Sequence, residues 1–313
     1  MSQQKPLLFS TEKYDYLKSK IASQSEKNIE IGAIDIQIFP DEERYMRLIT
    51  NVKDRDVYLL GGTISNDDTL EIFDIASAIA KNGANSLSLI IPYFGYSTME
   101  RAVKEGEVVT AKNRALLLSS IPKSIRGNKV YLFDLHSEGI PHYFENNTIP
   151  IHIYCKEIIM QAAKDLASDD FVLASTDAGR AKWVESLAND MGVNAAFVFK
   201  RRVSGDETHV TSISADVKNK KVVIYDDMIR TGGSLINAAK AYKEFGAREI
   251  YVITTHGLFV GEAINKLKAC GIIEKVICTD THPNTQKLHD AFFQVYSIDT
   301  LIESLIKEQG NFQ

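Results

Sequence analysis

Apolar and polar residues alternate along the chain in two different patterns. Short, nearly continuous apolar runs rich in Val, Ile and Tyr are separated by longer segments in which apolar residues recur every three or four positions. The short runs are typical of strands buried on both faces, and the longer segments are typical of amphipathic helices. The sequence therefore predicts an α/β fold of mainly parallel sheets flanked by helices. We expect strands at residues 57–61, 86–91, 129–133, 171–175, 221–225 and 249–254, and helices at 68–81, 110–119, 179–191, 234–245 and 260–269.

The same order of elements occurs twice. In each half a strand leads through a loop into a helix that ends at a glycine, Gly83 or Gly246, and another strand follows. Glycine is common just after a helix because it adopts the left-handed conformation without strain. We interpret the repeat as an internal duplication, with one domain at residues 1–150 and another at 151–313. Independent use of the same βαβ order is the alternative.

The composition is that of an ordinary globular protein. The 313 residues are 44% hydrophobic and 25% charged, and the net charge is −5. A negative net charge argues against a general affinity for nucleic acid or for an anionic membrane. No run approaches the roughly 18 apolar residues of a membrane span. Residues 1–20 also lack the apolar core of a signal peptide, so the sequence predicts a cytoplasmic protein.

The most informative segment is VVIYDDMIRTGGSL, residues 222–235. Its apolar half predicts a buried strand, Asp226 and Asp227 follow, and small residues open the next helix. Backbone N–H groups and the positive end of the helix dipole would bind a phosphate there, and the two carboxylates would bind ribose hydroxyls. An ordinary strand-to-helix turn with a capping serine is the alternative. The small residues are Thr231, Gly232, Gly233 and Ser234.

This segment is similar to the loop that type I phosphoribosyltransferases share with pyrophosphokinases, and by itself it does not choose between them. Residues 39–48, 92–122, 133–144, 175–188 and 198–207 resemble, in order and spacing, the ribose-phosphate pyrophosphokinase family. The resemblance implies two phosphoribosyltransferase-like domains, with ATP on the N-terminal side and ribose 5-phosphate on the C-terminal side. It also implies Mg²⁺-dependent transfer of the β,γ-pyrophosphoryl group of ATP to ribose 5-phosphate, which yields phosphoribosyl pyrophosphate and AMP.

The resemblance further assigns roles to single residues. Lys200 and Arg202 match the catalytic loop, where cations would stabilise a transferring group that needs little covalent help. His136 and Asp177 match positions associated with the metal bound to ATP. In the family a neighbouring subunit completes the ATP site, which implies a homo-oligomer. The other candidates are Phe39, Asp41, Glu43, Glu100 and Arg101 for ATP; Asp177, Ala178, Gly179 and Arg180 for pyrophosphate; and Asp226, Asp227, Arg230, Thr231, Gly232, Gly233 and Ser234 for ribose 5-phosphate.

Parts of the sequence are closer to the phosphate-independent class II members than to class I, among them Thr-His-Gly-Leu-Phe at 255–259, and we interpret the chain as class II. Thr98 and Met99 stand where class I members have an Arg-Gln pair, and Arg180 and Arg230 replace a glycine and an acid. Two alternatives stay open. A phosphoribosyltransferase would not need the ATP-side segments, and a catalytically silent regulatory homologue would explain the departures.

Overall fold

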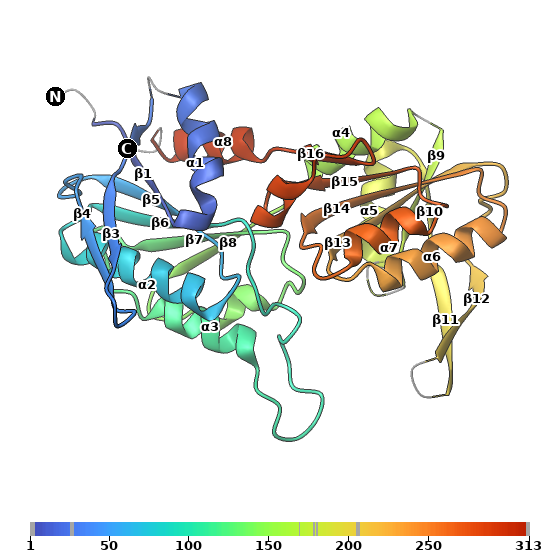
Figure 1. Ribbon diagram of the computed structural model, residues 1–313, viewed down its shortest axis with the longest axis horizontal. Helices are drawn as coiled ribbons and strands as arrows, with labels where there is room; N and C mark the ends of the chain where they lie inside the picture. Colours follow the sequence, from blue (N-terminus) through green and yellow to red (C-terminus); the bar gives the residue numbers. More distant parts are fainter. Residues whose placement is uncertain are drawn as a thin grey trace. The chain divides into compact units, whose positions relative to one another are not determined.

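The computed structural model describes residues 4–25, 28–168, 170–177, 179, 181–204 and 207–310, with the backbone alone at 25, 200–204, 207–211 and 308–310. The chain forms two compact units (Figure 1). Unit 1 comprises Met1–Tyr154 and Asp299–Gln313, and unit 2 comprises Cys155–Ile298. The division near residue 154 is close to the boundary expected at 150, but the C-terminal segment belongs to unit 1 and not to the unit that precedes it in the chain.

Unit 1 is built on a six-stranded sheet in the order β2-β1-β5-β6-β7-β8, and every pair of neighbours is parallel. Its central strands are nearly continuous apolar runs with buried residues on both faces. This is the pattern from which the parallel sheet was expected. The strands are β1 (Leu7–Ser10), β2 (Glu30–Ile31), β5 (Asp56–Leu60), β6 (Ser86–Ile91), β7 (Asn128–Phe133) and β8 (Ile149–Ile153).

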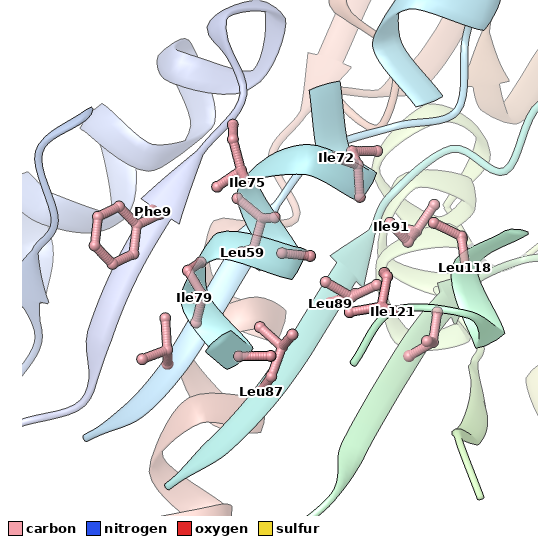
Figure 2. Close-up of a cluster of buried hydrophobic side chains, with 14 of the residues drawn as sticks. Phe9, Leu59, Ile72, Ile75, Ile79, Leu87, Leu89, Ile91, Leu118 and Ile121 are labelled. Carbon is pink, nitrogen blue, oxygen red and sulfur yellow. The ribbon is translucent and has the colours of Figure 1, made fainter. Parts of the chain in front are cut away.

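Helices cover both faces of this sheet (Figure 1). On one face, Ile72, Ile75 and Ile79 of α2 pack against alternate strand residues such as Leu59 and Leu87 (Figure 2). On the other face lie α1 and the C-terminal helix α8, joined by a hydrogen bond of 3.0 Å from Gln24 Nε2 to Asp299 Oδ2. The helices are η1 (Glu12–Tyr14), α1 (Asp15–Ser25), α2 (Asn66–Lys81), α3 (Thr110–Ser119), η2 (Ile140–Tyr143) and α8 (Asp299–Gly310).

Unit 2 repeats this plan. Its sheet has the order β10-β9-β13-β14-β15-β16, again with every pair parallel. The prediction of mainly parallel sheets flanked by helices is confirmed in both units. The strands are β9 (Phe171–Ser175), β10 (Asn194–Ala196), β13 (Lys221–Ile229), β14 (Glu249–Gly257), β15 (Lys275–Thr279) and β16 (Phe293–Tyr296), and the helices are α4 (Lys156–Ala167), α5 (Ala181–Met191), α6 (Gly233–Glu244), α7 (Ala263–Ala269) and η4 (Pro283–Lys287).

An antiparallel hairpin interrupts each unit between its second and third parallel strands. In unit 1 it is β3 (Ile34–Ile38) with β4 (Arg44–Leu48), and in unit 2 it is β11 (Val198–Ser204) with β12 (Glu207–Ile213). Both sheets therefore place their strands in the same chain order, including the position of the inserted hairpin. This agreement supports the interpretation of a duplicated unit.

In each unit a further helix packs against the helix that follows the first strand, and the two units take this further helix from different parts of the chain. In unit 2 it is α4, which directly precedes β9 and packs against α5. In unit 1 the corresponding helix is α8, which comes from the other end of the chain and packs against α1. The C-terminal helix thus completes unit 1. In the part of the chain that the structure describes, no helix is long and apolar enough to cross a membrane.

Candidate functional site

The predicted pyrophosphate and ribose segments meet at the carboxyl ends of β9 and β13. The two strands pair in parallel as far as Tyr225 opposite Ser175. Directly beyond this pair, Thr176 Oγ1 donates a hydrogen bond of 3.0 Å to Asp226 Oδ2. Because ligands of open α/β sheets bind outside the carboxyl ends of strands, this edge is the expected place for a substrate.

The turn after β9 is held by its own side chains. Ser175 Oγ donates to the carbonyl oxygen of Asp177 at 2.5 Å, and the N–H of Gly179 donates to Asp177 Oδ1 at 2.8 Å. Asp177 and Gly179 are exposed, whereas Ala178 and Arg180 lie outside the described residues. The turn therefore presents a carboxylate and a glycine backbone to solvent, next to Asp226.

A buried tyrosine fixes the strand ends beneath this turn. Tyr242 of α6 donates to the carbonyl oxygens of Ser175 (2.9 Å) and Ala196 (3.2 Å). Burial raises the pKa of the Tyr242 phenol, so its hydroxyl keeps the proton with which it donates. The helix that follows the phosphate loop is thereby tied to the strand that carries the pyrophosphate turn.

The two acids of β13 differ in their surroundings. The strand continues to Ile229, four residues further than predicted, so both acids lie inside it. Asp226 is partly buried and accepts hydrogen bonds on both carboxylate oxygens, from Thr176 and from the N–H of Asp227 at 3.0 Å. Asp227 is buried, with 2% of its surface exposed. Burying a carboxylate costs free energy unless hydrogen bonds or opposite charges stabilise its ionised form. We therefore expect contacts within the fold to hold the Asp227 carboxylate in a fixed position.

The loop between β13 and α6 leaves a helix N-terminus open. Gly232 is the N-cap residue, with φ of +78°, and no described side chain caps the helix. A Cβ atom at Gly232 would approach Leu267 to 3.3 Å, whereas a Cβ atom at Gly233 would meet no atom within 4 Å. The first N–H groups of a helix lack intrahelical partners, so they are positioned to bind an anion. Arg230, Thr231, Gly233 and Ser234 are exposed around this end.

Lys200 and Arg202 both lie on β11 of the inserted hairpin. Position 200 pairs with Val210 and position 202 with Thr208, and the register shifts just before and just after these two pairs. Positions 200 and 202 are therefore two residues apart on β11. At the segment that resembles the family's catalytic loop, the structure forms a two-stranded ribbon.

The predicted adenine residues form the turn of the hairpin in unit 1. The N–H of Phe39 donates to the carbonyl oxygen of Glu43 at 2.9 Å, and the N–H of Glu43 donates to Asp41 Oδ1 at 3.2 Å. Phe39 is 44% exposed, and its ring lies 6.3 Å from that of Tyr45. Asp41 therefore shapes the turn, and Phe39 presents an aromatic face to solvent.

The second ATP-side segment is the long connection after β6. Tyr143 donates from its hydroxyl to the carbonyl oxygen of Glu100 at 2.6 Å. Arg101 Nε lies 3.5 Å from Glu100 Oε1, and the Arg101 side chain is 77% exposed. Such an exposed pair contributes little stability, so the arginine is available to bind a ligand. The structure also shows Arg114 packed over the ring of Tyr96 at 4.6 Å, a contact that sequence reasoning missed because it joins two distant segments.

The predicted metal histidine follows β7 on a strained turn. Asp134 is buried and has φ of +34°, and the N–H of Leu135 donates to Nε2 of His152 at 2.9 Å. His136, the next residue, is exposed. His152 accepts a backbone hydrogen bond that orients this turn.

The two predicted metal residues belong to different units, His136 to unit 1 and Asp177 to unit 2. Among the described residues, no group of three or more His, Cys, Asp and Glu side chains is arranged to hold a metal ion. Mg²⁺ prefers oxygen ligands and usually keeps several waters, binding through one or two carboxylates together with substrate phosphates. The exposed carboxylate of Asp177 fits this mode of binding.

The fold and this site define a protein with two phosphoribosyltransferase-like units, and the comparisons with known proteins identify its family. Residues 7–122 match the N-terminal domain of ribose phosphate pyrophosphokinase, and residues 179–309 match the phosphoribosyl synthetase-associated domain. The chain is 31% identical to ribose-phosphate pyrophosphokinase 2, chloroplastic, of Arabidopsis thaliana over 89% of its own length and 69% of that protein's.

It is also 32% identical to a ribose-phosphate pyrophosphokinase of Chromobacterium violaceum, over 82% of this chain and 78% of that protein. The crystal structure of phosphoribosylpyrophosphate synthetase from Mycobacterium smegmatis shares its fold, with a TM-score of 0.87 over 99% of this chain and 100% of that chain at 24% identity. The chain belongs to the ribose-phosphate pyrophosphokinase family. The family resemblance predicted from its motifs is thereby confirmed.

Proposed function

We propose that this protein transfers the β,γ-pyrophosphoryl group of ATP to the 1-hydroxyl of ribose 5-phosphate. The products are phosphoribosyl pyrophosphate and AMP. The observation that carries the proposal is the open N-terminus of α6, which follows the paired acids of β13 in the chain. Asp226, the first of these acids, is hydrogen-bonded to Thr176, the residue before Asp177. Membership of the family supports the reaction itself.

Each part of this edge has a chemical task in the proposal. The 5-phosphate binds the N–H groups at the start of α6, together with the hydroxyls of Thr231 and Ser234 and the charge of Arg230. Asp226 and Asp227 bind sugar hydroxyls. The turn that begins at Asp177 receives the transferred pyrophosphate, with the exposed backbone of Gly179 held in place by the Asp177 carboxylate. Ala178 and Arg180 complete this turn in the proposal.

The transfer forms a bond from the sugar 1-oxygen to the β-phosphorus and breaks the bond from that phosphorus to the oxygen that leaves with AMP. The hydroxyl proton is released to solvent, and no atom changes its oxidation state. Lys200 and Arg202 stabilise the negative charge that develops on the transferring group. Mg²⁺ bound to the ATP phosphates would neutralise part of that charge, and Asp177 and His136 are the residues that would hold it, the histidine through water.

On the ATP side, Phe39 offers a stacking face for adenine, and Asp41, Glu43, Glu100 and Arg101 bind the rest of the nucleotide. The exposed position of the Phe39 turn suits a site that another subunit completes, so we include a homo-oligomer in the proposal.

We also place the protein in the cytoplasm. Sedimentation of the purified protein tests the first point, and fractionation of cells that express it tests the second.

An assay of AMP formation tests the proposed function. Purified protein is incubated with ribose 5-phosphate, ATP and Mg²⁺, and AMP and phosphoribosyl pyrophosphate are quantified. We expect equal amounts of both. Binding of ribose 5-phosphate without AMP would instead identify a catalytically silent homologue, the second candidate, which is favoured by Thr98 and Met99 in place of the Arg-Gln pair. Synthesis of a nucleotide from phosphoribosyl pyrophosphate and a base would identify a transferase.

We further propose class II behaviour, in which inorganic phosphate is not required and ADP competes with ATP. An allosteric effector needs contacts that favour one state of the protein, and Arg230 supplies fixed positive charge beside the phosphate loop. The initial rate is expected to vary by less than about twofold between zero and tens of millimolar phosphate. An effector that binds both states of the protein equally does not shift the equilibrium between them. Strong activation by phosphate with sigmoidal inhibition by ADP would assign the protein to class I.

A further inference from the structure

The end of β13 is held by a segment that no substrate role explains. Beyond the last β13–β14 pair, Ile229 with Gly257, the N–H groups of Leu258 and Phe259 both donate to the carbonyl oxygen of Ile229, at 3.0 and 3.1 Å. The N–H of Val260 then donates to the carbonyl oxygen of Arg230 at 3.0 Å. We call residues 257–260 the brace. It fixes the backbone at the point where the phosphate loop begins.

The brace has a backbone conformation that the surrounding packing must impose. Phe259 has φ of +43°, which bulky residues rarely adopt. Its ring is buried and packs edge-on against Phe293, with centroids 5.4 Å apart. The ring also folds back over Gly257, where a Cβ atom would come within 2.4 Å of it. Strain of this kind persists only where the fold determines it, and it is concentrated at functional sites.

One side chain outside the brace donates a hydrogen bond to its backbone. Asn284 Nδ2 donates to the carbonyl oxygen of Leu258 at 2.6 Å, and the backbone N–H of Asn284 donates to Nδ1 of His282 at 3.2 Å. Asn284 thus links the start of η4, which follows β15, to the brace. A polar side chain that satisfies a carbonyl oxygen in a partly buried loop is hard to replace, because the carbonyl would lose its partner.

We propose that Asn284 is a positioning residue for ribose 5-phosphate. It holds the brace, and the brace holds the carbonyl oxygens of Ile229 and Arg230, so that the N–H groups at the start of α6 meet the 5-phosphate in a preformed arrangement. Small displacements of such groups weaken binding strongly. Asn284 itself touches no substrate, and ATP binding does not depend on it. This inference rests on the proposed function.

Asn284→Asp tests the inference because it keeps the shape of the side chain and removes the donor. A carboxylate oxygen then faces the carbonyl oxygen of Leu258 and repels it. We expect the Kd and KM for ribose 5-phosphate to rise about tenfold, whereas the KM for ATP changes by less than about twofold. The midpoint of thermal unfolding should fall by only about 2–4 °C relative to the control Asn265→Asp, because the Leu258 carbonyl loses its partner. Asn265 is exposed on α7, and its side chain donates to Glu262 Oε2 at 2.6 Å and not to the Leu258 carbonyl.

Calorimetry with ribose 5-phosphate alone separates this inference from the proposed function. If Asn284→Asp binds the sugar as tightly as Asn265→Asp does, the inference is wrong even when the wild type produces AMP. Equal losses for sugar and ATP, with a lowered unfolding midpoint, would also refute it and show a purely structural role. If the wild type binds the sugar without forming AMP, and Asn284→Asp binds it weakly, the proposed function fails and the inference stands. A wild type that binds no sugar refutes both.

Discussion

Strand β5 of unit 1 and strand β13 of unit 2 occupy the same place in their sheets, and each leads through a pair of glycines into a helix. In unit 1 the glycines serve packing. A Cβ atom at Gly61 would come within 2.8 Å of Ile72, and one at Gly62 within 2.3 Å of the Tyr14 hydroxyl. In unit 2, by contrast, a Cβ atom at Gly233 would meet open space.

The two helix N-termini also differ, because side chains cap α2 and no described side chain caps α6. Helix α2 has a complete capping box, in which Ser65 Oγ accepts from the N–H of Asp68 and Asp68 accepts from the N–H of Ser65. Asp67 adds a second acid to its first turn. Helix α6 has neither a described side-chain cap nor an acid in its first turn. An anion would meet satisfied donors and negative charge at α2, and unsatisfied donors at α6.

The comparison teaches that the repeated architecture does not by itself define the site. Both units place a glycine pair and a helix start at a carboxyl strand end, yet only the residues around α6 suit a phosphate. The two hairpins also carry different proposed roles. The turn of β3–β4 holds Phe39, proposed to contact adenine, and β11 holds Lys200 and Arg202, proposed to stabilise the transferring group. Three predictions test how completely the functions of the two units are separated.

The largest effect is expected at the hairpin of unit 2. Lys200→Ala should lower kcat by about 10²–10³-fold, because the lysine is proposed to meet charge that develops only in the transition state. The KM values for both substrates should change by less than about threefold. Lys240→Ala, at an exposed position of α6, is the matched control and should retain full turnover. Near wild-type turnover of the Lys200 variant would remove this residue from the mechanism.

The second effect is expected at the buried acid of β13. Asp227→Asn keeps the shape of the side chain and removes its charge, so the KM for ribose 5-phosphate should rise about 10- to 100-fold, the value of one or two hydrogen bonds to a charged group. The KM for ATP should stay nearly constant. Asp216→Asn, an exposed acid that caps a turn in the same unit, is the control. Equal losses for sugar and ATP would show that the sugar lies elsewhere.

Much of the fold was predictable from local sequence, for a physical reason. Strands such as β5 and β9 are buried on both faces, so they appear as nearly continuous apolar runs, and the glycines after α2 and α6 mark helix ends. The hairpins β3–β4 and β11–β12 were missed because their strands are rich in polar residues. Nothing local in α8 indicates that it packs on α1, since both units offer an apolar face to a helix.

The site was predictable where it consists of one continuous segment. The phosphate loop and the Asp177 turn follow directly from strand, acid and glycine order. The link from Thr176 to Asp226 depends on the pairing of strands 50 residues apart, and the link from Asn284 to Leu258 joins residues 26 apart. Such contacts have no signature in a single sequence. The left-handed conformation of Phe259 was equally hidden, because a bulky residue rarely adopts it.

The smallest effects test the comparison between the two helix starts most directly. Ser65→Ala removes the cap of α2 and should destabilise the protein by about 1 kcal/mol, lowering the unfolding midpoint by roughly 2–4 °C, with all kinetic constants unchanged. Ser234→Ala removes a proposed phosphate ligand at α6, so the KM for ribose 5-phosphate should rise about fivefold and the unfolding midpoint should stay constant.

The same substitution thus has different consequences at the two helix starts, because the hydroxyl of Ser65, the N-cap residue of α2, binds its own helix, whereas that of Ser234, in the first turn of α6, is proposed to bind the substrate. Thermal unfolding and substrate titration of both variants, measured side by side, decide whether each serine stabilises its helix or binds the substrate. If Ser234→Ala lost stability without losing affinity, α6 would be capped in solution as α2 is, and the phosphate would need another site. If Ser65→Ala weakened sugar binding, the separation of structural and functional helix starts would be wrong, and both units would contribute to the sugar site.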